Sequence, residues 1–291
     1  MAISLASIRR VSASSPPRML IFGPAGVGKT TLASEAPKPV FIQAEDGTPG
    51  GAPLESFGKI TDYNEVTQAL SALATEAHDY KTVVIDTIDA LQPMIYDAVC
   101  NEQGWPDIES PGFGRGYVAA ESKWADLIDA LNYLRVHRGM NTILIGHSEV
   151  TTFSPPGSEA YSRYGLRIHK RAAGVITDAM DIVCFVNFKA DLKKVESGFG
   201  KKAVHAEGTG TRWAYTEERP AFLAKNRYEL PPEQIIVRGK LFNAWSAKVP
   251  FAHTESPGAT PGATPSATPA PTPVPDAPAA TMAAPPAPQV A

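Results

Sequence analysis

Residues 23–30 read Gly23-Pro24-Ala25-Gly26-Val27-Gly28-Lys29-Thr30, which matches the phosphate-binding pattern G-x-x-x-x-G-K-[ST] at every fixed position. The apolar run from Arg18 to Phe22 predicts a buried strand that leads into this loop, and Thr30 to Ala36 predicts a helix that leaves it. A strand, a glycine-rich loop and a helix in this order are the context in which the pattern binds a nucleoside triphosphate.

The residue types of the loop explain its chemistry. Glycines let backbone N–H groups surround the β-phosphate, and the following helix adds its positive N-terminal end. We expect Lys29 to reach the β- and γ-phosphates and the hydroxyl of Thr30 to hold Mg²⁺. Thr31 completes the predicted nucleotide-binding segment.

Composition limits the classes of protein to which the chain can belong. Its 291 residues are 43% hydrophobic, which is enough for a substantial core. The net charge of -3 gives no global reason to bind nucleic acid, so such binding needs a local basic patch. Cys100 and Cys184 are too few and too far apart for a disulfide framework or a zinc site. With no recognisable signal sequence or membrane-spanning run, we expect a soluble cytoplasmic protein without a membrane partner.

The chain divides by composition into three parts. We predict an N-terminal tail over 1–16, a folded domain over 17–250 and a disordered tail over 251–291. From Phe251 onward the sequence is dominated by Ala, Pro, Thr and Gly, with an imperfect Pro-Gly-Ala-Thr repeat. Such a segment cannot build a core and favours extended, polyproline-like conformations. Both a passive spacer and a docking motif remain open for this tail.

Strand and helix signals alternate through the folded part, which predicts an α/β fold with a mostly parallel, twisted sheet flanked by helices. Apolar stripes indicate helices around Val66–Leu73 and Trp124–Leu134. After Phe188, shorter strands with a turn at Gly208-Thr209-Gly210 predict a C-terminal β-hairpin extension. The predicted strands are Met19–Phe22, Val40–Gln43, Thr82–Asp86, Thr142–Gly146 and Ile182–Val186.

Two carboxylates are candidates for work on the phosphates. Asp86 ends an apolar strand, the position expected of the acid that holds Mg²⁺ opposite a phosphate-binding loop. Because Thr87 follows Asp86, the chain lacks the adjacent Asp-Glu pair of many ring-forming ATPases. Glu45, after a strand that we expect beside the loop strand or one removed, can orient the attacking water. A solvated acidic turn at Glu45-Asp46 is the alternative.

Three segments of the chain resemble RecA-like proteins. Val40 to Asp46 resembles the strand that ends in the catalytic glutamate, which here is Glu45. Thr142 to His147 resembles the strand that ends in the γ-phosphate sensor, a glutamine in RecA and a histidine here. Leu223 to Arg227 resembles a pair of cations around an asparagine that reaches the neighbouring subunit's γ-phosphate.

The resemblance covers about 17–245 and is closest to the phage-encoded RecA-like recombination ATPases of the Sak-four type. It implies a RecA-like P-loop core that binds ATP and Mg²⁺, with catalytic roles for Glu45, His147, Lys225 and Arg227. Arg227 stands where the family has a lysine, which keeps the charge and adds a planar fork suited to phosphate. The additional domains of larger relatives are not recognised, so ring and filament both remain open.

Two segments carry the residues expected to bind single-stranded DNA. Tyr161 to Arg171 combines cations with aromatic rings and contains no acid, as single-stranded nucleic acid requires. A second segment, Ser110 to Tyr117, is glycine-rich. A basic helix start and an ordinary surface loop are the alternatives for the two segments. The resemblance places DNA-binding loops at both, and the candidate residues are Phe113, Arg115, Tyr117, Tyr161, Arg163, Tyr164, Arg167, Lys170 and Arg171.

These features predict a DNA-stimulated, Mg²⁺-dependent ATPase that assembles as a homo-oligomer on single-stranded DNA. Its expected role is annealing or strand exchange in phage homologous recombination, with a single-strand-binding protein as a possible partner. An alternative is a P-loop switch or loader that acts on a protein partner without binding DNA. A helicase-type motor is disfavoured by the missing Asp-Glu pair.

Overall fold

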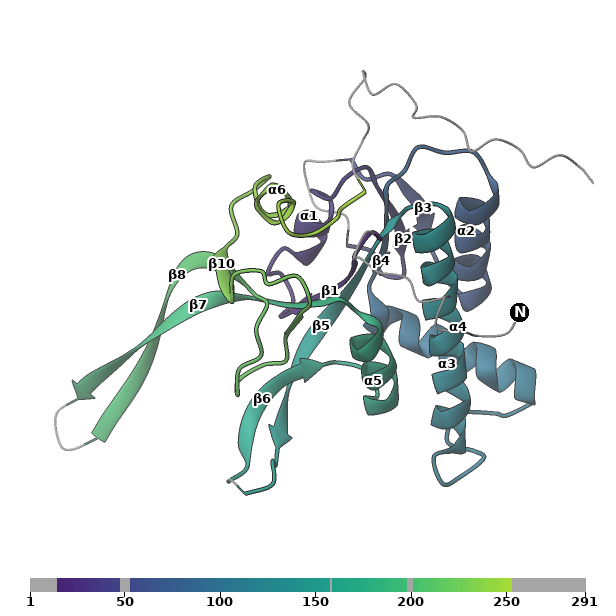
Figure 1. Ribbon diagram of the computed structural model, residues 1–291. Helices are drawn as coiled ribbons and strands as arrows, with labels where there is room; N and C mark the ends of the chain where they lie inside the picture. Colours follow the sequence, from purple (N-terminus) through teal and green to yellow (C-terminus); the bar gives the residue numbers. More distant parts are fainter. Residues whose placement is uncertain (1–14, 48–52, 158, 198–200, 253–291) are drawn as a thin grey trace, which may run out of the picture. The chain divides into compact units, whose positions relative to one another are not determined.

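The computed structural model describes residues 15–47, 53–157, 159–197 and 201–252, apart from the side chains of 190–209. Its centre is a sheet with the strand order β10-β8-β7-β1-β5-β4-β2-β3, in which the strands from β7 to β3 run parallel (Figure 1). The strands are β1 (Arg18–Gly23), β2 (Pro39–Gln43), β3 (Ser56–Lys59), β4 (Thr82–Asp86), β5 (Asn141–Phe153), β6 (Tyr161–Leu166), β7 (Ile182–Ser197), β8 (Lys201–Tyr215), β9 (Lys225–Asn226) and β10 (Glu233–Ile235).

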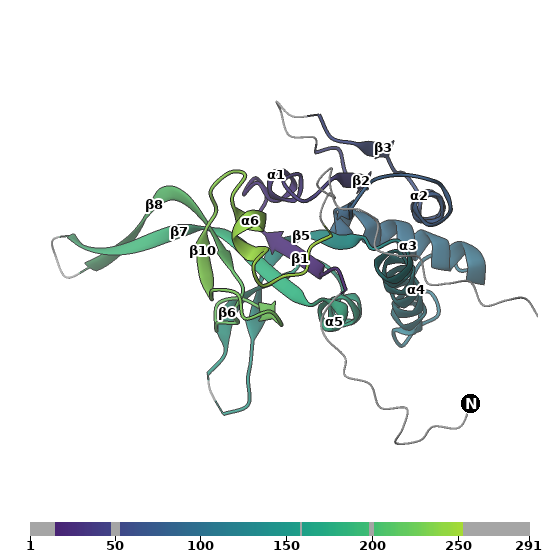
Figure 2. The same ribbon diagram turned by 45° about the horizontal axis from the view of Figure 1, so that its top comes forward.

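Helices cover both faces of the sheet, and alternation along each strand decides which side chains meet them. In β1, Leu20 and Phe22 pack into the core shared with α2 to α5, whereas Met19 and Ile21 pack into the core shared with α1 and α6 (Figure 2). The helices are α1 (Lys29–Ala33), α2 (Tyr63–Thr75), α3 (Ile88–Gln103), α4 (Arg115–His137), α5 (Lys170–Ala179) and α6 (Leu241–Trp245). The predicted α/β architecture is confirmed.

All five predicted strands and both predicted helical stripes lie in elements of the expected type. Helix α3 was not predicted, because Pro93 and polar residues interrupt its apolar pattern. It begins directly after β4, where the side chain of Thr87 caps it by accepting a hydrogen bond from the backbone N–H of Ala90 at 3.3 Å. This cap turns the chain at the edge where the phosphate-binding loop lies.

The predicted hairpin extension is formed by β7 and β8, which reach beyond the other strands (Figure 1). The segment Gly208-Thr209-Gly210 is not the turn of this hairpin. It lies within β8, where the register shifts so that residues 209–211 oppose a single residue of β7. The glycines therefore belong to a β-bulge, in which Gly210 has φ of 69°.

The described part of the chain begins and ends beside the start of β5. The carbonyl of Pro17 accepts a hydrogen bond from the backbone N–H of Thr142 at 3.0 Å, and the N–H of Ala252 donates to Asn141 Oδ1 at 2.8 Å. Phe251 is buried against Phe242, so the folded domain includes these last residues, which composition had assigned to the tail. Ser15 and Pro16 of the predicted N-terminal tail are described as well, and the remaining residues of both predicted tails lie outside the described residues. No helix in the described ranges is long and apolar enough to cross a membrane.

Parallel strands bring their carboxyl ends to one edge of the sheet, and ligands of such folds bind there. The ends of β1, β5, β4 and β2 are neighbours in that order. The expectation that β2 lies beside β1 or one strand away is wrong, because β5 and β4 both separate them. Glu45 therefore reaches the site from its far side.

Candidate nucleotide-binding site

A cleft of about 270 Å³ opens at the carboxyl ends of these four strands. It combines the phosphate-binding loop with the predicted acids and the predicted sensor, which come from separate parts of the sequence. The residues that line it are Gly26, Gly28, Lys29, Thr30, Thr31, Glu45, Gly47, Asp86, Thr87 and His147. A larger cavity of about 320 Å³, between α2 and α4, is lined mainly by apolar groups and lacks a glycine-rich loop. The first cleft is therefore the candidate site for a triphosphate.

The loop has the backbone that its glycines allow. Gly26 and Gly28 have φ of 73° and 88°, in the left-handed region that favours glycine. Lys29 is 5% exposed, and its Nζ donates hydrogen bonds to the carbonyls of Gly23 and Pro24 at 3.0 Å each. Burial lowers the pKa of Lys29, and nearby carboxylates oppose that shift. Its ammonium group thus lies at the loop, where a phosphate can replace carbonyl oxygens as its partner.

Arg212 of β8 is a residue of this site that no sequence pattern marks. A Cβ atom on Gly28 would collide with its guanidinium group, so the cation lies directly over the loop. Its backbone is fixed by the residue that follows β10, because the carbonyl of Arg212 accepts a hydrogen bond from the N–H of Ile236 at 2.9 Å. A guanidinium in this position is suited to an anionic ligand in the loop.

Asp86 and Thr30 form the predicted metal-binding pair. The Thr30 hydroxyl donates a hydrogen bond to Asp86 Oδ2 at 2.7 Å, while Asp86 Oδ1 is buried and has no hydrogen-bond partner among the described residues. Burial raises the pKa of Asp86 to about 6, and Glu45 adds to this effect. A buried carboxylate oxygen without a partner, beside a hydroxyl, fits an Mg²⁺ ion and its water ligands.

Replacing Asp86 by Asn should stabilise the protein in the absence of nucleotide and Mg²⁺. Because the folded-state pKa is raised to about 6, ionisation of Asp86 costs stability as the pH rises from about 4 to 6, about 3 kcal/mol in full. We therefore expect Asp86→Asn to raise the free energy of unfolding above pH 7 and this gain to shrink towards pH 4. Urea titrations at several pH values measure this gain in the free energy of unfolding. A gain that is constant with pH would show that the raised pKa of Asp86 is not its cause.

Glu45 follows β2 and is partly exposed at the cleft. Its backbone N–H donates to the carbonyl of Asp86 at 3.3 Å, and its Oε2 accepts a hydrogen bond from the Thr87 hydroxyl at 3.3 Å. The neighbouring Asp46 is exposed and does not line the cleft. Of the two acids, Glu45 is thus the one that lines the cleft.

His147 ends the central part of β5 and is held by an acid that sequence analysis missed. Asp89, in the first turn of α3, accepts a hydrogen bond from the backbone N–H of His147 at 2.9 Å and pairs with His147 Nδ1 at 2.8 Å. Arg167 Nη2 donates to the same carboxylate at 2.6 Å. Ligand atoms of Glu45, Asp89 and His147 all lie within 4.8 Å of one another. The only available signal was the position of Asp89, three residues after Asp86.

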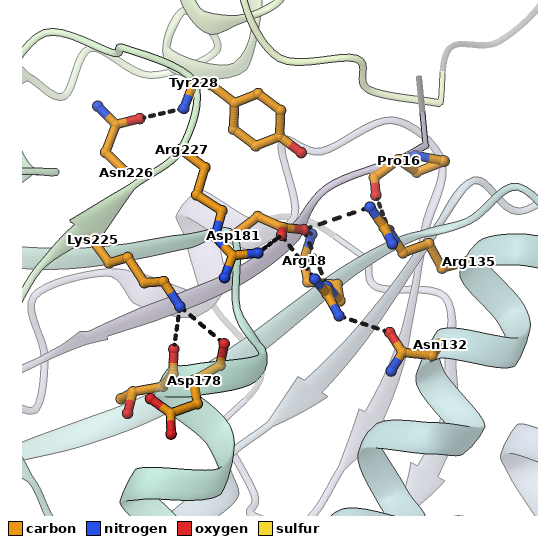
Figure 3. A network of polar contacts seen from close by, with 11 residues as sticks. Pro16, Arg18, Asn132, Arg135, Asp178, Asp181, Lys225, Asn226, Arg227 and Tyr228 are labelled. Atoms are coloured by element: carbon orange, nitrogen blue, oxygen red, sulfur yellow. Dashed lines mark hydrogen bonds and ion pairs between the residues drawn. The ribbon is translucent and has the colours of Figure 1, made fainter. Parts of the chain in front are cut away.

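The predicted pair of neighbour-directed cations lies at the opposite edge of the sheet. Lys225 Nζ donates to the carbonyls of Thr177 and Asp178, both at 2.9 Å, at the C-terminal end of α5 (Figure 3). Arg227 Nη1 donates to Asp181 Oδ1 at 3.0 Å. Because Asp181 precedes β7 and the phosphate-binding loop follows the far end of β1, neither cation reaches its own chain's cleft. Their predicted role requires a second subunit.

Asp181 is the acid on which this cationic cluster depends. It is 6% exposed and pairs with Arg18 at 2.8 Å, with Arg135 at 3.8 Å and with Arg227 at 3.0 Å (Figure 3). Removing one member of a buried ion pair leaves the others without compensation.

We expect Asp181→Ala to lower the free energy of unfolding by about 3 kcal/mol or more, measured by urea denaturation. Asp178→Ala, on an exposed acid three residues away, is the matched control and should change stability by less than about 0.5 kcal/mol. Equal effects of the two substitutions would contradict the role of Asp181.

The two predicted DNA-binding segments are less loop-like than expected. Arg115 and Tyr117 belong to the first turn of α4, Tyr161 to Leu166 forms β6, and Lys170 and Arg171 begin α5. Phe113, which remains in the loop, is 99% exposed.

The segments lie against each other. The ring of Tyr117 stacks on that of His169, with centroids 4.2 Å apart and planes 7° from parallel. Arg171 also forms an ion pair with Glu121 of α4 at 2.9 Å.

The β5–β6 hairpin carries aromatic and cationic side chains together. Arg163 lies 5.0 Å from the ring centroid of Phe153, which packs on Tyr161 at 5.6 Å. Phe153 was not among the predicted residues, although it is 38% exposed. The ring of Tyr164 packs on Phe185 at 5.2 Å, so this tyrosine contributes to the core. A further cleft, of about 390 Å³, lies between this hairpin and α5 and is lined by Arg163 and Lys170 among others.

Comparison with known proteins identifies the family of the chain. The family profile described as AAA domain matches residues 15–228, which is well over half of the chain. No curated relative matches the sequence. Among solved structures, the chain is similar to the crystal structure of the RadB recombinase, at 13% identity and a TM-score of 0.43, over 76% of this chain and 87% of that one. The chain thus belongs to the AAA domain family, and its α/β core carries the phosphate-binding loop of a P-loop ATPase.

Proposed function

We propose that this ATPase assembles on single-stranded DNA and promotes annealing or strand exchange, as a recombination protein of the phage Sak-four type. The observation that carries the proposal is the continuous path from cleft to hairpin: His147 lines the cleft, Asp89 holds His147, and Arg167 of the predicted DNA-binding segment shares that carboxylate. A nucleotide site linked in this way to a basic, aromatic surface is suited to ATP-dependent DNA binding.

Each residue of the cleft has a separate role in the hydrolysis of ATP. The loop amides and Lys29 bind the phosphates, and Thr30 and Asp86 hold Mg²⁺, which neutralises phosphate charge when it is bound. Glu45 orients a water molecule and accepts its proton as the oxygen attacks the γ-phosphorus and the bond to the β-phosphate oxygen breaks. His147, fixed by Asp89, contacts the terminal phosphate.

Lys225 and Arg227 complete the site of a neighbouring subunit in this proposal. They lie at the sheet edge opposite their own cleft, and Arg227 is 51% exposed, so a second subunit can approach it. Cations supplied by a neighbour stabilise the charge of the transition state, which makes hydrolysis depend on assembly. Turnover per subunit should therefore rise with protein concentration and with single-stranded DNA, in a steady-state phosphate-release assay. A rate indifferent to both would rule the proposal out.

DNA binding is tested by fluorescence anisotropy with a labelled oligothymidine at several salt concentrations. We expect Arg163→Ala combined with Lys170→Ala to weaken binding and to reduce the slope of log K against log salt by about 0.7 for each phosphate that is no longer neutralised. Lys59→Ala, on the exposed edge strand β3, is the matched control and should bind as the unaltered protein does.

The alternative function, a P-loop switch that acts on a protein partner, predicts a different result. Such a protein binds ATP with unchanged affinity in all these variants and shows no salt-dependent affinity for the oligonucleotide. That outcome would replace the recombination proposal by the switch. Electron micrographs of the protein with ATP and single-stranded DNA would distinguish a ring from a filament.

A further inference from the structure

Asp89 joins the nucleotide cleft to the β5–β6 hairpin, although no motif contains it. Its side chain is 6% exposed and receives three hydrogen bonds, two from His147 and one from Arg167. The His147 ring nitrogen and Arg167 bind the same oxygen, Oδ2. Burial alone would raise the pKa of Asp89, but these hydrogen bonds hold that pKa well below its usual range. Asp89 is thus a buried anion with two partners, of which His147 lines the cleft and Arg167 follows β6.

The first partner, His147, is fixed in orientation by this contact. Its backbone N–H and its Nδ1 both bind one carboxylate, at 2.9 and 2.8 Å, so the ring cannot turn without breaking a hydrogen bond. Nε2 is then the ring nitrogen left for a ligand in the cleft that His147 lines. Carboxylates commonly set the orientation of a functional imidazole in this way.

The second partner, Arg167, is anchored to the hairpin. It follows β6 directly, and its backbone N–H donates to the carbonyl of His147 at 3.0 Å. Its guanidinium side chain is 53% exposed, so it can exchange Asp89 for another anion. Asp89 and Arg167 both act electrostatically on Lys29 of the phosphate-binding loop. Negative charge that arrives at Lys29 therefore acts on this pair as well.

We propose that Asp89 is a positioning residue that couples the nucleotide in the cleft to the β5–β6 hairpin, through its shared hold on His147 and Arg167. A terminal phosphate that binds His147 competes with Asp89 for the cations around it and loosens Arg167 from the carboxylate. When nucleotide binds, the β5–β6 hairpin therefore loses the contact between Arg167 and Asp89 that ties it to the core. This inference deepens the proposed function, on which it rests for the role of His147.

Hydrogen exchange measured by mass spectrometry tests the coupling without DNA. In the unaltered protein, a non-hydrolysable ATP analogue with Mg²⁺ should change amide exchange in β5 and β6. In Asp89→Asn this change should disappear, while affinity for a fluorescent ATP analogue stays within about threefold, since a coupling residue alters communication more than binding. Asp97→Asn, on an exposed acid of the same helix, should behave as the unaltered protein does.

Two further variants separate coupling from a merely structural role. Arg167→Ala should abolish the same exchange response, and combining it with Asp89→Asn should have no additional effect, because both substitutions break one link. Asp89→Glu should restore part of the response. If Asp89→Asn fails to fold, the half-exposed Arg167 still provides the test.

A nucleotide-dependent exchange response that persists in Asp89→Asn or Arg167→Ala, or that is missing from the unaltered protein, would overturn the inference. The oligonucleotide titration tests the recombination role separately, and its result does not depend on this coupling. A protein that binds no DNA but shows the Asp89-dependent response would refute the recombination role and leave the coupling intact.

Discussion

Lys29→Ala should abolish ATP hydrolysis and weaken ATP binding by about thirtyfold or more, which is the first of the two largest effects that we expect. Lys29 is buried at the loop with its ammonium group on the carbonyls of Gly23 and Pro24. A triphosphate in the loop replaces these neutral acceptors by charged oxygens, and truncating one partner of such a buried charge pair costs about 2–5 kcal/mol. Isothermal titration with an ATP analogue and a phosphate-release assay measure the two effects.

The control for this variant is Lys38→Ala, which removes a half-exposed lysine that forms an ion pair with Asp79 at the surface. It should leave ATP binding unchanged and stability within about 1 kcal/mol. Thermal unfolding shows whether Lys29→Ala is folded. A folded Lys29→Ala that hydrolyses ATP at more than a tenth of the original rate would show that the loop is not the catalytic phosphate site.

Glu45→Gln should reduce the rate of hydrolysis by about 10²- to 10⁴-fold and leave ATP affinity within a few-fold. The amide keeps the size of the side chain and can still accept the hydrogen bond from Thr87, but it cannot take a proton from the attacking water. Single-turnover measurements separate the chemical step from binding. The variant should also retain the ATP-bound form on single-stranded DNA, because release requires hydrolysis.

Asp46→Asn is the matched control, since this acid is the next residue and lies exposed outside the cleft. It should hydrolyse ATP at close to the original rate. If Asp46→Asn were the inactive variant and Glu45→Gln the active one, the general base would have to be reassigned to the alternative carboxylate of the same turn.

The sheet and the cleft could be predicted because their signals are local. Parallel strands are buried on both faces and give continuous apolar runs such as Val83 to Ile85. The loop depends on glycines at fixed spacing, and Gly26 and Gly28 indeed have positive φ. An acid at the end of a buried strand is equally visible, as with Asp86.

The rest of the site depends on contacts between residues that are distant in sequence. Asp89 and His147 are separated along the chain by most of α3 and all of α4, and nothing near Asp89 indicates its partner. Arg212 reaches Gly28 only because β8 folds back along β7, which pairs with β1. Tyr117 and the segment around His169 were predicted as separate loops, and helix packing decides that they stack. Tertiary contact, not local propensity, sets these positions.

Pro17 and Ala252 both form hydrogen bonds with the start of β5, at the edge of the sheet where the parallel strands begin. The cleft lies at the opposite edge, where these strands end. A linker added before Pro17 or after Ala252 therefore starts on the side of the sheet away from the nucleotide. This suits attachment of the protein to a surface for single-molecule measurements. Immobilised through either flank, the protein presents its cleft to the solution from which ATP and DNA arrive.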